Sequence, residues 1–84
     1  MSVKDDADSY AREYAATAGQ QAAFFREQAE RHRREAARAR LGAEMSDGEE
    51  ARAAQTKRAE QLETLGRHDD TMAAAFEARA RGPN

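Results

Sequence analysis

The stretch LGAEMSDGEE, Leu41–Glu50, decides the fold because it interrupts a chain with helical character on both sides. Ser46-Asp47-Gly48-Glu49 has the spacing of a capping box, in which the serine oxygen accepts a hydrogen bond from the Glu49 amide. Gly42 is placed to end the preceding helix in a left-handed conformation. A helix end and a helix start a few residues apart predict a hairpin. The expected turn residues are Gly42, Ser46, Gly48 and Glu49.

The composition predicts helices with a thin core. The apolar fraction is 39%, but 21 of the 84 residues are alanine, and there are only three Leu, three Phe and one Val. Alanine, arginine, glutamate and glutamine are strong helix formers, and a net charge of −2 gives little self-repulsion. The chain holds no cysteine, so a disulfide cannot reinforce the core. Self-association or a partner is the expected source of additional burial.

The segment before the turn carries one apolar stripe with spacings of three and four residues, as expected for an amphipathic helix. We predict a long helix over about 4–42 on this basis. Ion pairs four residues apart, such as Arg26 with Glu30, are expected to support it. The stripe consists of Val3, Ala7, Tyr10, Tyr14, Ala18, Ala22, Phe25, Ala29, His32, Ala36, Ala39 and Ala43.

A second stripe predicts a second helix over about 47–80. Its apolar positions keep their phase across Gly66, which favours one continuous helix. In the alternative, Gly66 ends the helix and Asp69 or Asp70 caps a short third one. Folding the chain near residue 47 places Phe25 near Leu65 and Met72. The expected fold is therefore an all-α antiparallel two-helix hairpin, one domain over residues 1–84, with frayed ends at about 1–3 and 81–84.

Phe24 lies outside the first stripe, in a row of seven-residue spacing with Val3, Tyr10 and Thr17. Such a row is typical of a second contact surface on a helix. We expect it to form a homodimer, which makes a four-helix bundle; the alternative is that Phe24 is simply an exposed aromatic. The predicted core of hairpin and dimer comprises Tyr10, Tyr14, Phe24, Phe25, Leu62, Leu65, Met72 and Phe76.

An arginine-rich stretch, Arg26–Arg40, is the most distinctive charged feature. Outward arginines at helical spacing contact phosphates in nucleic-acid-binding proteins. Glutamates interleave with them, however, and the sequence pI is about 5.7, which favours a solvated face or a surface for an acidic protein. The candidate partner or nucleic-acid surface is Arg26, Arg31, Arg34 and Arg38.

No catalytic, cofactor or metal site is predicted. His32 and Glu35 stand one turn apart, but a metal site in a helical bundle needs carboxylates from several helices. We expect Leu62 and its neighbours to face His32, and we interpret His32 as a partly buried structural histidine. The cluster His68-Asp69-Asp70 is interpreted as capping and solvated residues, since a hairpin offers no sizeable pocket; Asp69 is also a candidate partner for arginines across a subunit interface.

The length and the mid-chain turn resemble the small secreted helical hairpins of the WXG100 type. The Trp-x-Gly turn of those proteins is missing, because Leu41-Gly42 and Asp47-Gly48 have no tryptophan beside them. Because the length and the turn agree while the motif is missing, a secreted hairpin of this architecture is an alternative and not the main expectation. The acidic start MSVKDDADS lacks the apolar segment of a signal peptide, and no apolar run is long enough for a membrane span, so the expected location is the cytoplasm.

These patterns lead to one principal expectation of function. The chain is expected to be a small non-enzymatic interaction module, of the adaptor, regulator or inhibitor type, that acts as a homodimer through exposed helix faces. Its protein partner is unknown. Nucleic-acid association through the arginine stretch is the main alternative.

Overall fold

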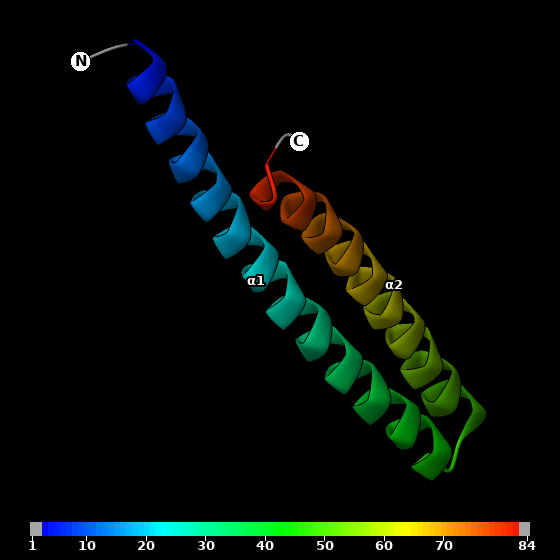
Figure 1. Cartoon of the computed structure of the whole chain (residues 1–84). Coiled ribbons are helices and arrows are strands. Elements are labelled where there is room, and N and C mark those ends of the chain that lie inside the picture. Colours follow the sequence, from blue (N-terminus) through cyan, green and yellow to red (C-terminus); the bar gives the residue numbers. More distant parts are fainter. Residues whose placement is uncertain (1–2, 83–84) are drawn as a thin grey trace.

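Two long α-helices lie side by side in opposite directions and form a hairpin (Figure 1). The computed structural model describes residues 3–82, and the side chains of residues 7–82. Helix α1 spans Val3–Met45 and helix α2 spans Glu49–Ala80. The molecule measures 70 × 14 × 14 Å. The prediction of an all-α antiparallel hairpin is confirmed, with α1 ending three residues later and α2 beginning two residues later than expected.

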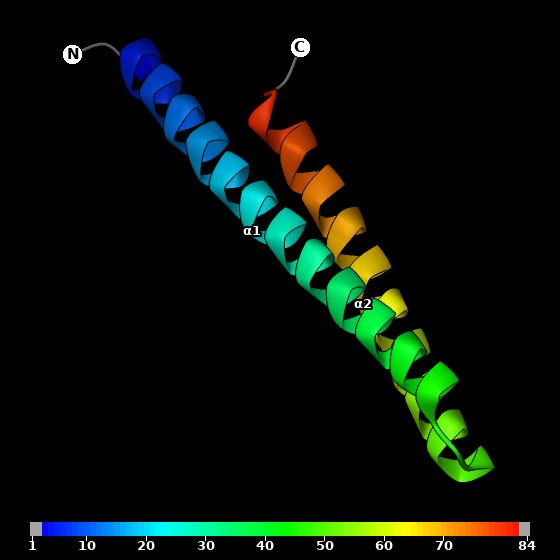
Figure 2. The ribbon, with the colours of Figure 1, turned by 90° about the horizontal axis from the view of Figure 1, so that it is seen from below.

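Helix α1 extends well beyond the end of α2, as two perpendicular views show (Figures 1 and 2). It has 43 residues against 32 in α2. At 1.5 Å per residue, the difference corresponds to about 16 Å of helix. The last residues of α2 lie beside Gly19 and Tyr14. We call residues 3–10 the α1 overhang, since they precede the part of α1 that faces α2.

The turn closes with chemistry that differs from the predicted capping box. Helix α1 runs through Gly42, which is not left-handed, and ends at Met45. Ser46 Oγ donates to the Gly42 carbonyl at 2.7 Å, and Gly48 occupies the N-cap of α2 without a side-chain cap. The expected roles of Gly42 and Ser46 are therefore wrong. The serine hydroxyl satisfies one of the free carbonyls at the end of α1 instead of a free amide at the start of α2.

The remaining predictions for the helix ends concern the start of α2 and the two ends of the chain. Glu49 begins α2 and, with Glu50, places negative charge in its first turn, where the helix dipole favours it. Gly82 is the glycine with a left-handed φ, 75°, directly after α2. The frayed ends were predicted at about 1–3 and 81–84. Residues 1–2 and 83–84 lie outside the described residues, whereas Val3 is helical and Arg81 forms the C-cap of α2.

The core consists almost entirely of alanine. The stripe predicted for α1 is buried from residue 18 to residue 43, except that Phe25 and His32 are partly exposed. Among the described side chains, no large residue is completely buried. The apolar side chains that are less than 9% exposed are Ala18, Ala22, Ala29, Ala36, Ala39, Ala43, Ala59, Leu62 and Ala73.

The contacts between the helices are offset from those predicted. Phe25 stacks on Phe76 with ring centroids 5.8 Å apart, one helical turn beyond Met72. Side chains on a helix lean toward its N-terminus, and the two N-termini lie at opposite ends of the hairpin. Each α1 side chain therefore meets an α2 residue farther from the turn than a level pairing would give.

Helix α2 is continuous across Gly66, as the phase of its stripe predicted. Gly66 is buried, and a Cβ atom placed on it would lie 3.7 Å from the Ala29 carbonyl oxygen and 3.7 Å from Arg33 Cγ. One methyl group therefore fits in ordinary contact, whereas a larger side chain meets the backbone of α1.

A pair of variants tests this close approach. Gly66→Ala is expected to stabilise the hairpin by up to about 1 kcal/mol, because alanine loses less backbone entropy in a helix than glycine. Gly66→Leu is expected to destabilise it by about 1–3 kcal/mol through overpacking. Urea unfolding followed by circular dichroism measures both. Equal stability of the two variants would show that the helices are not in close contact at this position.

Candidate functional site

A hydrogen-bonded pair of polar residues lies in the middle of the alanine core. His32 Nδ1 is 2.6 Å from Asp69 Oδ2, and the two side chains are 21% and 10% exposed. Each residue occupies the inward stripe of its own helix. His32 is therefore a partly buried structural histidine, as predicted, but Asp69 faces it in addition to apolar neighbours, and Asp69 binds within the hairpin.

Three arginines of α1 pair with three carboxylates of α2 along one side of the hairpin. Arg26 makes two hydrogen bonds to Glu77, at 2.8 and 3.1 Å, and a third to Asp70. Arg33 also binds Asp70, at 2.9 Å. We call this side the ion-paired face, defined by Arg26, Arg33, Arg40, Glu63, Asp70 and Glu77.

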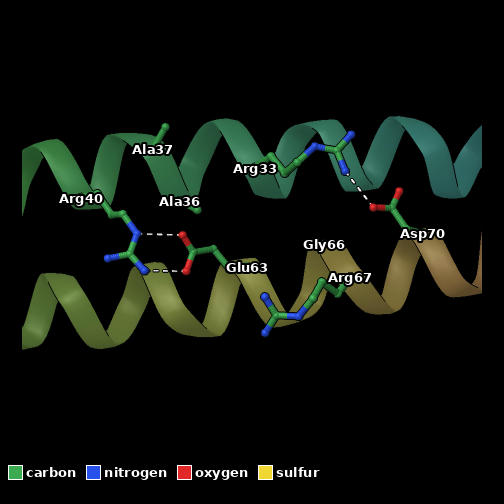
Figure 3. A pocket seen from close by; sticks show the side chains of 8 residues that line it. All are labelled: Arg33, Ala36, Ala37, Arg40, Glu63, Gly66, Arg67 and Asp70. Atoms are coloured by element: carbon green, nitrogen blue, oxygen red, sulfur yellow. Dashed lines mark hydrogen bonds and ion pairs between the residues drawn. The ribbon is translucent and has the colours of Figure 1, made fainter.

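Figure 3 shows part of this face, with a groove between the helices. Arg40 holds Glu63 through two hydrogen bonds, at 2.6 and 2.7 Å. Farther along, Arg33 reaches across to Asp70, and Gly66 lies between these two pairs on α2 (Figure 3). The ion pairs therefore bridge the groove, and of the charged side chains that line it Arg67 alone is outside them and donates to Thr64 Oγ1 instead.

These ion pairs shift the pKa values of their members. The hydrogen bonds from Arg40 hold the pKa of Glu63 below its usual value, and those from Arg26 do the same for Glu77. The same bonds raise the pKa of both arginines. A carboxyl group whose pKa is lowered by folding stabilises the folded state above its usual pKa of about 4.5, and this stabilisation is lost as the pH falls.

The hairpin is therefore expected to lose stability as the pH falls from about 6 to about 3. Thermal unfolding by circular dichroism over this range measures the loss. The double variant Glu63→Gln with Glu77→Gln should be less stable than the wild type at neutral pH, with a shallower pH dependence. Glu27→Gln with Glu30→Gln is a matched control, because these exposed carboxylates lie in the middle of α1 and form no ion pair in the described structure. An identical slope in the two double variants would contradict the assignment.

The buried polar pair gives a separate prediction. His32→Leu and Asp69→Leu should each destabilise the hairpin by about 1–3 kcal/mol, because each leaves a partly buried polar group without its partner. The double variant should recover most of this loss, since an apolar pair of similar size replaces the polar one. Chemical unfolding of all four proteins gives the coupling energy. Additive losses would show that the hydrogen bond contributes nothing.

The charged side chains pair between the helices and not along them. The ion pairs found among residues 7–82 all join α1 to α2, so the expected pairs four residues apart, such as Arg26 with Glu30, are wrong. Of the predicted arginine surface, Arg26 is engaged by α2. Its other members are exposed and form no ion pair within the described part: Arg31, Arg34 and Arg38.

The cluster His68-Asp69-Asp70 is divided among three surroundings. Asp69 points into the core, Asp70 lies on the ion-paired face, and His68 is exposed. Over the residues that the structure describes, no three histidine, aspartate or glutamate side chains are grouped to hold a metal ion. The cluster does not form a common site for acid–base chemistry.

The predicted core residues fall into two groups. Leu62 is buried, and Phe25, Met72 and Phe76 are partly buried. The others are exposed, by 46% for Leu65, 51% for Phe24, 58% for Tyr14 and 76% for Tyr10. Tyr10, Tyr14 and Leu65 are therefore not part of the hairpin core, whereas Phe24 was assigned to the second contact surface and not to that core. Their predicted role in a dimer core concerns a second copy and stays a prediction.

The exposed Phe24 and Leu65 and the partly buried Met72 lie on the side of the hairpin opposite the ion-paired face. Phe24 is two residues from Arg26 and therefore about 160° around α1 from it, and Met72 has the same relation to Asp70 on α2. Leu65 is likewise two residues from Glu63. The rings of Phe24 and Phe25 form a T-shaped pair with centroids 5.4 Å apart, and Phe25 stacks on Phe76. We call the side with Phe24, Leu65 and Met72 the aromatic face.

Comparison with known protein families, curated proteins and solved structures gives no match for this chain. Neither described helix contains an apolar segment of the length that a membrane crossing requires. The geometry of the two faces is therefore the basis for any functional argument.

Proposed function

We propose that this chain is a non-enzymatic protein-interaction module that acts as a homodimer through its aromatic face. The observation that carries the proposal is the contrast between the two sides of the hairpin. On one side arginines and carboxylates satisfy each other, and on the other Phe24 and Leu65 are about half exposed. An exposed apolar surface with a polar opposite side is typical of an interaction surface.

The accessible surface supports an additional contact. The hairpin exposes 6532 Å². A compact monomer of 9.3 kDa is expected to expose about 5,000 Å². The excess arises because the molecule is only two helices thick, so every helix has most of its circumference in solvent. A second hairpin on the aromatic face would cover part of this excess and give a four-helix bundle.

The alternatives have less support. Of the surface expected to contact nucleic acid, Arg26 is bound by carboxylates of α2, whereas Arg31, Arg34 and Arg38 are exposed. Interleaved glutamates and a pI of about 5.7 are unfavourable for binding phosphates there. A secreted hairpin of the WXG100 type would need the missing Trp-x-Gly turn. A cytoplasmic location, and an adaptor, regulator or inhibitor role toward an unidentified protein, remain expectations.

Light scattering coupled to size exclusion tests the dimer directly. The wild type is expected at twice its 9.3 kDa mass, and Phe24→Ser should raise the dissociation constant by at least about tenfold, because each subunit loses a buried phenyl ring. Leu41→Ser is the matched control. Leu41 is 56% exposed and lies on the outer side of α1, so this variant should remain dimeric. A wild type that stays monomeric at high concentration would overturn the proposal.

A further inference from the structure

We propose that the second copy lies antiparallel along α1, with the two-fold axis beside Phe24. This proposal rests on the proposed homodimer and adds its direction and register. Phe24 meets Phe24 of the partner subunit, and the tyrosines at one end of α1 meet the charged residues at the other end of the partner's α1.

The length of α1 favours this position of the axis. Helix α1 spans Val3–Met45, and its midpoint is residue 24. Pairing about this residue brings the whole helix into contact with its copy, including the overhang that α2 leaves uncovered (Figure 1). A strip about 60 Å long and about 10 Å wide on each subunit corresponds to an interface of roughly 1,200 Å² in total, the lower limit for specific association.

The charge pattern favours the antiparallel direction. Residues at seven-residue intervals form a row on α1 that is uncharged in its first half and basic in its second, with Tyr10, Thr17 and Phe24 followed by Arg31 and Arg38. In a parallel pair each arginine would lie beside its own copy, and like charges repel. In the antiparallel pair Tyr10 lies beside Arg38 of the partner subunit, where the guanidinium group can stack on the phenol ring.

A neighbouring row of residues on α1 also favours the antiparallel direction. It contains Tyr14, Gln21, Gln28 and Glu35, again seven residues apart. The antiparallel register brings Tyr14 to Glu35 of the partner subunit, so that the phenol donates to the carboxylate. It also brings Gln21 to Gln28 of the partner subunit, and two amides form complementary hydrogen bonds. Each polar group in this row therefore finds a partner of suitable chemistry; Tyr14 and Gln21 are exposed, and Gln28 and Glu35 are partly exposed.

The antiparallel register also determines which part of the hairpin the α1 overhang of the partner subunit contacts. Because the numbers of facing residues add up to about 48 in this register, the partner's overhang, residues 3–10, lies beside residues 38–45, at the end of the hairpin nearest the turn. In the same half of the hairpin Leu65 is 46% exposed on the aromatic face. The partner's tyrosines cover this region, and no α2 from the partner competes for it. Antiparallel pairing therefore explains why α1 is longer than α2.

Single cysteines test the register, since the natural chain has none. Under mild oxidation, Phe24→Cys is expected to give a covalent dimer. Tyr10→Cys and Arg38→Cys should each remain uncrosslinked alone, but should crosslink to each other after the two proteins are mixed, unfolded and refolded. A tag on one of them distinguishes the mixed product by mass. All three positions are exposed, and circular dichroism checks that each variant keeps its helices.

The results of light scattering and crosslinking distinguish the proposed homodimer from its proposed antiparallel register. A dimeric wild type in which Tyr10→Cys crosslinks to itself would show a parallel pair and overturn the register while keeping the homodimer. A dimer without a crosslink at Phe24→Cys would also overturn the register. A wild type that is monomeric by light scattering, and whose cysteine variants give no crosslinks, would overturn both.

Discussion

The close approach of two helices across small side chains is the constraint on which the rest of the structure depends. Alanines form nearly the whole buried surface, and Gly66 lies against the backbone of α1 near Ala29. Dispersion contacts between such surfaces are individually weak and depend on short distances. Any side chain that separates the helices loses these contacts along the neighbouring turns as well, so the small residues act together.

An alanine surface holds two helices together but does not fix their register along the helix axis, because one methyl group resembles the next. Alignment comes from groups that differ: the hydrogen bond between His32 and Asp69, the stacked rings of Phe25 and Phe76, and the ion pairs of Arg26 and Arg40. Sliding one helix by a turn would leave Asp69 buried without its partner, which is unfavourable. Polar groups thus provide the specificity that the apolar core lacks.

The periodicity of the sequence was sufficient to predict the hairpin, its two stripes and the continuity of α2. It was insufficient for the turn, because a serine hydroxyl satisfies either the end of one helix or the start of the next, and the flanking residues of Ser46 suit both. The register was missed because level pairing ignores the lean of side chains toward each N-terminus. Once the register is known, His32 and Asp69 are recognisable as the two polar members of facing stripes. The arginines were assigned to solvent or nucleic acid because a single helix does not show which carboxylates its neighbour will present.

The alanine core also has a thermodynamic consequence. The heat capacity change of unfolding increases with the apolar surface exposed and decreases with the polar surface exposed. Since no large side chain among residues 7–82 is completely buried, unfolding this hairpin exposes little additional apolar area per residue. Its stability curve is therefore flat: the free energy of unfolding varies less with temperature than in a protein of equal length with a leucine core. A chain of this kind loses little stability on cooling, which makes a thin core a suitable design for function over a wide range of temperatures.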